Sequence, residues 1–309
     1  MPSPSIRDLA TSFDVALRVV NRSPRTRYLY QQSIRFYCEW LESQGIPATL
    51  NNLNRHLITG WMADLSERVE VGTVRNRLRG MRRFCRWLEK EGEVDKAPTL
   101  GVEMPAPKEK PNRTLTDDEL AAMIKACARP RTRSGTWDAH AFEGRRDEVI
   151  IRLLADCGIR VSELAGITLD DLDRSHEVIY VTGKGDRPRV VPYGARTAQA
   201  LDRYLRLRTA HPKATKTDRL ILTQRGPITA DGIRWRLEQV GEQAGVKDVH
   251  PHAFRHTAAH RWLMAGGSER GLMAVMGWRS DAMLSTYARS TQVERAHAEH
   301  RRLRLGDTV

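Results

Sequence analysis

The chain has 309 residues, 40% of them hydrophobic, which is enough to build two compact domains that each bury a core. Its net charge of +13 and pI near 10.0 favour an extended polyanion as the partner, so nucleic acid ranks ahead of an anionic membrane surface. No stretch approaches the roughly 18 consecutive apolar residues of a transmembrane helix, and the first residues lack the apolar run of a secretory signal. We therefore expect a cytoplasmic protein with no membrane partner.

Four stretches before residue 97 have apolar side chains at helical spacing. A Ser-Pro pair at 23–24, a Gly-Ile-Pro run at 45–47 and Gly72 act as caps or breakers between them. This pattern predicts a small helical bundle. The clearest apolar stripes lie in the second and fourth stretches and consist of Tyr30, Ile34, Tyr37 and Leu41, broadened by Trp40, and of Val74, Leu78, Met81 and Cys85.

The fourth stretch also carries a cationic stripe beside its apolar one. It consists of Arg75, Arg79, Arg82 and Arg86 at i, i+4, i+7 and i+11. Like charges at this spacing repel one another by a few tenths of a kcal/mol, and a phosphate backbone would relieve that repulsion. A solvated surface face is the alternative interpretation. We predict that these four arginines bind DNA.

Residues 97–113 contain four prolines and show no helical or alternating apolar spacing, which is typical of an extended linker. We place a helical DNA-binding domain at residues 1–105, a linker at 106–113 and a second domain at 114–309. The first 105 residues have a net charge of +4 and the remainder +9. Both domains are therefore basic, as a DNA clamp requires.

The second domain has a mixed pattern. Thr116 followed by acidic residues predicts a helix start, residues 129–135 a basic loop, and Gly158 the end of a longer helix. Two β-type runs at 177–182 and 189–192 flank a Gly-Lys-Gly-Asp turn, which predicts a hairpin, and helices follow. The expected fold is mainly α, with a small antiparallel β-sheet in the second domain.

The four cysteines are widely spaced among apolar neighbours and form no C-x-x-C pair. We expect reduced core thiols and no zinc site built from them.

Arg160 and Lys184 are the first candidate site residues. Arg160 follows the helix-ending Gly158, where a guanidinium can emerge from a rigid element; an ordinary ion-paired arginine is the alternative. Lys184 lies between two glycines at the hairpin tip, where the backbone can approach another molecule, although a mobile turn has the same composition. The run is not a P-loop, because it lacks that motif's earlier glycine and its following Ser or Thr.

Residues 250–260 concentrate four of the ten histidines around Arg255. Three of them, His252, His256 and His260, share a helical face at i, i+4 spacing, which can bind zinc, but the H-E-x-x-H motif is absent. The other interpretation is anion chemistry, in which His252 and Arg255 address one phosphate. His256 and His260 would then pack against them or orient them.

Tyr287 ends a segment in which Gly277 is expected to start a short helical stretch. An isolated tyrosine is usually a core or interface residue. As a nucleophile it would need neighbouring cations and histidines, because a phenol of pKa about 10 is mostly protonated at neutral pH.

The order of these residues resembles the catalytic domain of the tyrosine recombinase (phage integrase) family over roughly residues 112–290. The ordered set is Arg160 with Glu163, Lys184 in a hairpin, His252-x-x-Arg255, Gly277-Trp278 and Tyr287.

The resemblance implies a role for each residue. Arg160 and Arg255 bind the scissile phosphate, where fixed guanidiniums stabilise the developing negative charge. Lys184 is the general acid for the leaving 5′ oxygen, and His252 assists proton transfer. Tyr287 attacks to give a 3′-phosphotyrosine, which a 5′ hydroxyl of the partner strand resolves, so neither a metal nor a cofactor is required.

Two further positions follow from the resemblance. Many family members carry histidine where this chain has Trp278, and an indole N–H can position a phosphate oxygen but cannot carry a proton at neutral pH. Acid and base work therefore falls on Lys184 and His252. Glu163 matches an acidic position that supports the active site.

The first domain resembles the family's helical core-binding domain, and the two domains together would form a C-shaped clamp around duplex DNA. Residues 291–305 resemble a terminal helix that docks onto a neighbouring subunit, which implies a homotetramer on two specific DNA sites, or a hetero-assembly with a second recombinase. In size the chain is similar to Xer-like recombinases, so we expect no N-terminal arm-binding domain.

The resemblance predicts a site-specific recombinase acting in integration, excision or resolution. The alternatives are a non-catalytic DNA-binding regulator of the same fold and a DNA-relaxing enzyme of type IB topoisomerase character.

Overall fold

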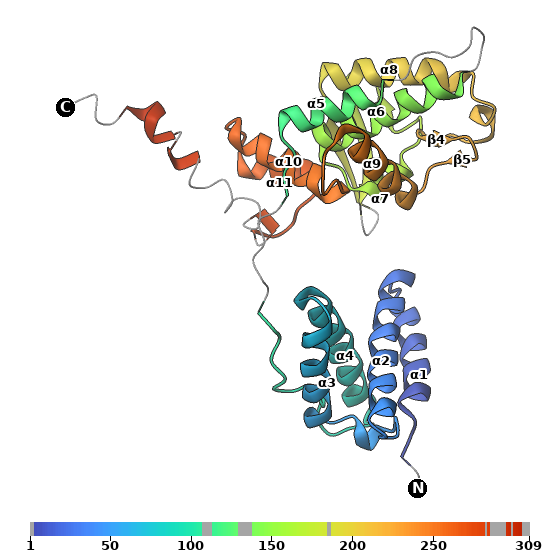
Figure 1. The fold of residues 1–309 in the computed structure, drawn as a ribbon, viewed down its shortest axis with the longest axis vertical. Coiled ribbons are helices and arrows are strands. Elements are labelled where there is room, and N and C mark those ends of the chain that lie inside the picture. The colour runs from blue at the N-terminus through green and yellow to red at the C-terminus, as the bar shows by residue number, and fades with distance from the viewer. Residues whose placement is uncertain are drawn as a thin grey trace. The chain divides into compact units, whose positions relative to one another are not determined.

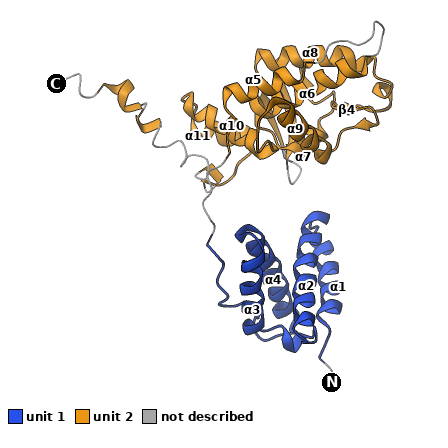
Figure 2. Cartoon of the chain, in the orientation of Figure 1, with its two compact units in different colours: residues 1–110 blue, residues 111–309 orange. Residues whose placement is uncertain are grey.

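The computed structural model describes residues 3–106, 113–128, 138–183, 187–281, 283–284, 295–297 and 299–304. The chain divides into two compact units, residues 1–110 and 111–309, and each unit has its own hydrophobic core (Figure 2). No helix within the described ranges is long and apolar enough to cross a membrane.

Unit 1 is the expected helical bundle (Figure 1). Its helices are α1 Ile6–Val19, α2 Pro24–Ser43, α3 Arg55–Arg68 and α4 Val71–Glu91, with a 3-10 turn at Leu50–Asn52. The side chains of Ser5, Ser23 and Asn54 begin the first three helices, because each accepts a hydrogen bond from a backbone N–H of the first turn.

The apolar stripes of α2 and α4 face each other in the core of unit 1. Ile34, Tyr37 and Leu41 are buried, as are all four members of the α4 stripe. The two helices approach closely at Gly80, where an added Cβ would lie 2.4 Å from Ser33 Oγ. The burial predicted from the spacing is therefore confirmed.

Gly72 was expected to separate two helices, and this prediction is wrong. The chain is extended at Val69 and Glu70, and α4 begins at Val71, so Gly72 lies in its first turn. Glycine destabilises a helix by about 1 kcal/mol relative to alanine, because it loses more backbone freedom on folding. The burial of Val74 and Leu78 outweighs its poor helix propensity.

Residues 97–104 also differ from the expected extended linker, because they pack on unit 1. Ala97, Thr99 and Val102 are buried, and turn-type hydrogen bonds join Leu100 N to Ala97 O (2.8 Å) and Val102 N to Thr99 O (3.2 Å). A packed turn has neither helical nor strand periodicity, so the spacing of apolar residues does not reveal its burial.

Unit 2 is mainly helical with two small antiparallel sheets, which confirms the expected fold class (Figure 1). Its helices are α5 Asp117–Ala126, α6 Ala139–Cys157, α7 Val161–Gly166, α8 Ala195–Thr209, α9 Ala230–Ala244, α10 Pro251–Met264 and α11 Glu269–Met276, with a 3-10 turn at Ala214–Lys216. Its strands are β1 Leu172–Asp173, β2 Val178–Gly183, β3 Arg187–Pro192, β4 Leu222–Thr223 and β5 Gly226–Pro227.

The expected hairpin is formed by β2 and β3, which pair with the buried Ile179 opposite the buried Val191. β1 adds a third strand on the other side of β2. α5 begins after Thr116, as the sequence predicted, and a capping box formed by Thr116 and Glu119 stabilises this helix start.

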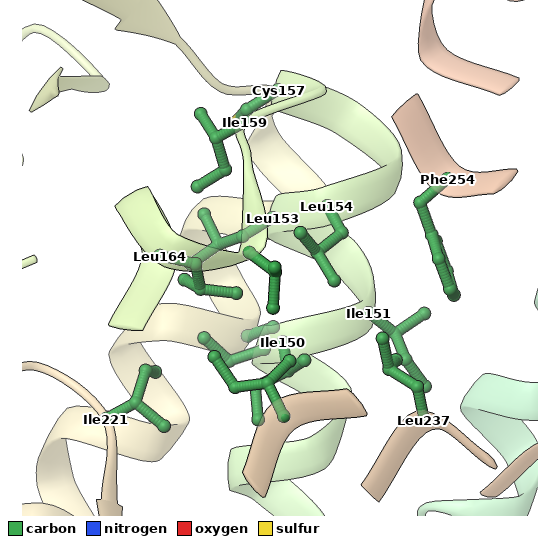
Figure 3. Packing of buried hydrophobic residues seen from close by; sticks show 14 of the residues in the cluster. Ile150, Ile151, Leu153, Leu154, Cys157, Ile159, Leu164, Ile221, Leu237 and Phe254 are labelled. Carbon is green, nitrogen blue, oxygen red and sulfur yellow. The ribbon is translucent and has the colours of Figure 1, made fainter. Parts of the chain in front are cut away.

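The core of unit 2 is built around α6. Figure 3 shows Ile150, Ile151 and Leu154 of α6 among apolar side chains of its neighbours, with Leu164 from α7, Leu237 from α9 and Phe254 from α10. All four cysteines are buried, which confirms that they are core residues as predicted.

Two glycines with positive φ end the helices that lead to the candidate site. Gly158 (φ 59°) ends α6, as predicted. Gly277 (φ 64°) ends α11, whereas the sequence pattern indicated that it starts a helical stretch. The left-handed conformation, which glycine adopts without steric cost, reverses the chain and ends the helix.

Candidate active site

Arg160 lies immediately after the end of α6, at the N-cap of α7. Its backbone N–H donates to Glu163 Oε2 (2.7 Å), and its Nη1 donates to Glu163 Oε1 (2.8 Å). The side chain is 35% exposed. The Glu163 carboxylate therefore orients the Arg160 guanidinium, which remains accessible to solvent.

Arg255 projects from α10 and is 3% exposed. Its guanidinium donates to two backbone carbonyls, those of Gly158 and Met276 (2.6 Å for the latter). These carbonyls lie at the ends of α6 and α11. Arg255 thus holds together the two helix ends that precede Arg160 and Trp278.

Trp278 follows the left-handed Gly277, and its backbone N–H donates back to Met273 O (2.9 Å). This turn places the buried indole beside Arg255, with the guanidinium carbon 5.5 Å from the ring centroid. The contact is a cation–π interaction, which favours a fixed orientation of the guanidinium.

His252 and His256 lie one turn apart on α10, with ring centroids 6.3 Å apart. Partial burial lowers the pKa of His252 below its ordinary 6.5, and the positive charges of Arg255 and Arg160 lower it further. Burial, with His252 nearby, lowers the pKa of His256 to about 4. His252 is therefore neutral at pH 7 and able to accept a proton.

The spacing of His252, His256 and His260 is also compatible with a metal site. Among the residues that the structure describes, no group of three or more His, Cys, Asp or Glu side chains converges in a way that could hold a metal ion.

Glu163 is the anionic centre of the site. Burial alone would raise its pKa, but hydrogen bonds from Arg189 and from the Arg160 backbone and side chain lower the pKa to about 2. Arg189 donates to both carboxylate oxygens of Glu163, at 2.9 and 2.8 Å. Glu163 is therefore ionised throughout the physiological range.

Arg189 was not among the residues predicted from the sequence. A signal was present, because strand alternation places Arg189 on the same face as Val191, which is fully buried. An arginine on the inward face of a strand requires a buried acceptor.

Lys184 and Tyr287 lie outside the residues that the structure describes. The described strands on either side of Lys184 end at Gly183 and begin at Arg187.

The four arginines of the cationic stripe lie on α4, as predicted, but they fall into two pairs. Arg79 and Arg86 are exposed. Arg82 and Arg75 are partly buried and donate to the backbone carbonyls of Val102 and Pro105. One pair therefore faces solvent, and the other fixes the segment that follows α4.

The described part of the predicted docking helix, within residues 295–304, contacts its own chain. Arg295 Nη1 lies 3.1 Å from Glu269 Oε1 at the start of α11.

Three comparisons place the chain among known proteins. The sequence profile described as "Phage integrase family" matches residues 113–294. Tyrosine recombinase XerC of Mycobacterium sp. (strain JLS) is 31% identical over 288 residues, which cover 90% of this chain and 92% of that protein.

Solved structures of low identity share the fold. The Tn1549 transposon integrase in complex with a circular intermediate DNA has a TM-score of 0.74 at 20% identity and covers 97% of this chain and 100% of that one. A lambda integrase tetramer bound to a Holliday junction has a TM-score of 0.67 at 15% identity and covers 92% and 77%. From the family profile and the recombinase relative together, the chain belongs to the phage integrase family and is a site-specific tyrosine recombinase.

Proposed function

We propose that this chain cleaves duplex DNA at specific sites through a 3′-phosphotyrosine at Tyr287 and rejoins the strands after exchange. The observation that carries the proposal is the convergence of Arg160, Arg255 and a neutral His252. The positive charges of both arginines lower the pKa of His252. Arg160 donates to Glu163, and Arg255 donates to Gly158 O at the end of the helix that Arg160 follows.

The arginines would bind the non-bridging oxygens of the scissile phosphate. Phosphoryl transfer builds negative charge on these oxygens, and guanidiniums that are already oriented stabilise that charge without reorganisation. Glu163 orients Arg160, and two carbonyls orient Arg255. Trp278, stacked beside Arg255, would help to position the phosphate.

Two proton transfers accompany the cleavage. The phenol of Tyr287 loses its proton as its oxygen bonds to phosphorus, and neutral His252 is suited to accept that proton. The bond from phosphorus to the 5′ oxygen breaks, and Lys184 would supply the proton that gives a free 5′ hydroxyl. Attack by a 5′ hydroxyl of the partner strand reverses these steps, so the bond energy is conserved.

The DNA contacts are expected to include the exposed arginines of α4, which match the spacing of a phosphate-facing stripe. We propose a homotetramer on two DNA sites as the working assembly. The lambda integrase tetramer on a Holliday junction supports this proposal by its fold.

A recombinase is favoured over the two alternatives, a non-catalytic regulator and a relaxing enzyme of type IB topoisomerase character. A relative that matches 90% of the chain at 31% identity is a tyrosine recombinase.

The test is covalent trapping. Sequences selected from a random library for binding are built into duplexes with a nick close to the cleavage site, so that the short 5′ fragment diffuses away and religation stops. Wild type should form a denaturant-resistant adduct that maps to Tyr287, and Tyr287→Phe should form none. Binding without any adduct by wild type would overturn the proposal in favour of the regulator.

A further inference from the structure

Two arginines of the candidate active site, Arg160 and Arg255, are joined through hydrogen bonds and short stretches of backbone. Arg255 donates to Gly158 O, two residues before Arg160, and to Met276 O at the end of α11. Arg160 donates to Glu163. These contacts leave a gap in the connection between Glu163 and the end of α11.

Arg189 fills that gap. Its Nη1 and Nη2 donate to the two oxygens of Glu163 at 2.9 and 2.8 Å, and its Nε donates to Val275 O at 2.9 Å. Val275 directly precedes Met276, the acceptor for Arg255. The contacts therefore close a ring that runs through β3, α7, α11 and α10.

We infer that Arg189 is the positioning residue that closes this ring and thereby sets the spacing of Arg160 and Arg255 for one phosphate. The inference rests on the proposed function, because it assigns a purpose to the spacing of the two phosphate-binding arginines.

The contacts favour an indirect role over direct phosphate binding. Each of the three guanidinium nitrogens of Arg189 already donates within the ring. Arg189 therefore acts through Glu163 and through the end of α11.

The ring needs the planar fork of an arginine. Lysine keeps the charge, but its single ammonium cannot donate to both carboxylate oxygens of Glu163 and also to the carbonyl of Val275. Gly277 leaves room for the fork, because a Cβ at that position would lie 3.2 Å from Arg189 Cδ.

The experiment measures single-turnover cleavage and DNA affinity separately for wild type, Arg189→Gln and Arg189→Lys. The matched control is Arg174→Gln, which removes an equal charge from an arginine that is 61% exposed and paired with Asp202. A displacement of about 1 Å in a catalytic group costs about 100-fold in rate. We expect Arg189→Gln to lose about this much in cleavage while its affinity for DNA stays close to that of the control.

Arg189→Lys should recover only part of the rate, and Glu163→Gln combined with Arg189→Gln should cleave no more slowly than Glu163→Gln alone. Cleavage by Arg189→Gln at the control rate, or a loss no larger than its loss of folded protein, would overturn the inference. If Arg189→Gln does not fold, Arg189→Lys decides, and wild-type rate in that variant overturns it. Failure of wild type to form an adduct would instead count against the proposed function.

Discussion

At the scale of single residues, Glu163 is a carboxylate whose side chain is 4% exposed and which is held by two arginines. Its pKa in the folded protein is about 2, against an ordinary 4.5, so as pH falls the unfolded chain takes up this proton first. The charge therefore contributes stability that is fully present above about pH 4.5 and is lost as pH falls toward 2.

Glu163→Gln keeps the shape of the side chain but leaves two arginines without their counter-charge. We expect it to lower the free energy of unfolding by about 3 kcal/mol at pH 7, as when one partner of a buried ion pair is removed. The difference from wild type should shrink as pH is lowered below 4.5.

Urea unfolding at several pH values, over the range in which both proteins fold, measures this difference. Asp231→Asn is the control, since Asp231 is 92% exposed and pairs with Arg234 at the surface, where ion pairs contribute little. A Glu163→Gln effect as small as that of the control would contradict the expectation.

The order of the motif predicts Arg160, Glu163, His252 and Arg255 as site residues, and the structure places these residues near one another. The motif does not predict Arg189, the second arginine that binds Glu163. Arg189 is 26 positions away in sequence, and its role depends on the strand face and on the helix end that it meets. Short-range spacing carries no information on such a contact.

At the scale of secondary-structure elements, the end of α6 sets the position of Arg160. Gly158 has φ 59°, and an added Cβ would lie 2.4 Å from Met276 Cε. A left-handed conformation costs a residue with a Cβ roughly 1–2 kcal/mol. Gly158→Ala should therefore lower the free energy of unfolding by about this amount. It should also displace the side chain of Met276, whose carbonyl accepts a hydrogen bond from Arg255.

Gly245→Ala is the matched control for Gly158→Ala. Gly245 ends α9 with φ 70°, and nothing lies within 4 Å of an added Cβ. We expect Gly245→Ala to lower stability by the backbone cost alone, and Gly158→Ala to lower both stability and cleavage by more. Equal melting temperatures and equal cleavage rates in the two variants would show that the contact with Met276 is relieved at no cost.

Helix ends illustrate what local sequence can predict. Thr116 with Glu119 predicted a helix start correctly, because the side chains of a capping box make their hydrogen bonds within the same turn. Gly72 and Gly277 were misassigned, because a glycine permits a left-handed cap but does not require one. Whether it lies within a helix or ends it depends on the tertiary packing around it.

The cationic stripe of α4 gives the second prediction for an element. Arg79→Ala and Arg86→Ala should each weaken DNA binding and reduce the slope of log affinity against log salt by about one for each phosphate that is no longer neutralised. Arg75 and Arg82 already donate hydrogen bonds to backbone carbonyls of the segment after α4. Removing either side chain should therefore also increase amide exchange in residues 97–105.

Binding titrations at several salt concentrations measure the slopes. Unchanged slopes in all four alanine variants would show that the stripe does not contact DNA.

At the scale of the whole molecule, the net charge of +13 gives affinity for DNA of any sequence, and it does not assemble two sites into one complex. Assembly needs contacts between protein chains. Of the described residues, those at 295–297 and 299–304 are suited to such contacts, since the sequence of this segment resembles a docking helix and an ion pair that joins it to its own chain is partly exposed. This ion pair joins Arg295 and Glu269, whose side chains are 30% and 46% exposed, and Arg295 also lines a cavity of about 460 Å³.

Exposed ion pairs of this kind contribute about 0–1 kcal/mol, so breaking this contact costs little, and we expect the tail to bind a neighbour instead. Deleting residues 295–309 should therefore leave binding to a single half-site unchanged and abolish the complex that joins two DNA sites. Glu269→Gln, which breaks only the contact within the chain, should preserve that complex. Sedimentation of protein–DNA mixtures distinguishes the species, and a two-site complex that persists after the deletion would mean that other surfaces of the chain hold the assembly together.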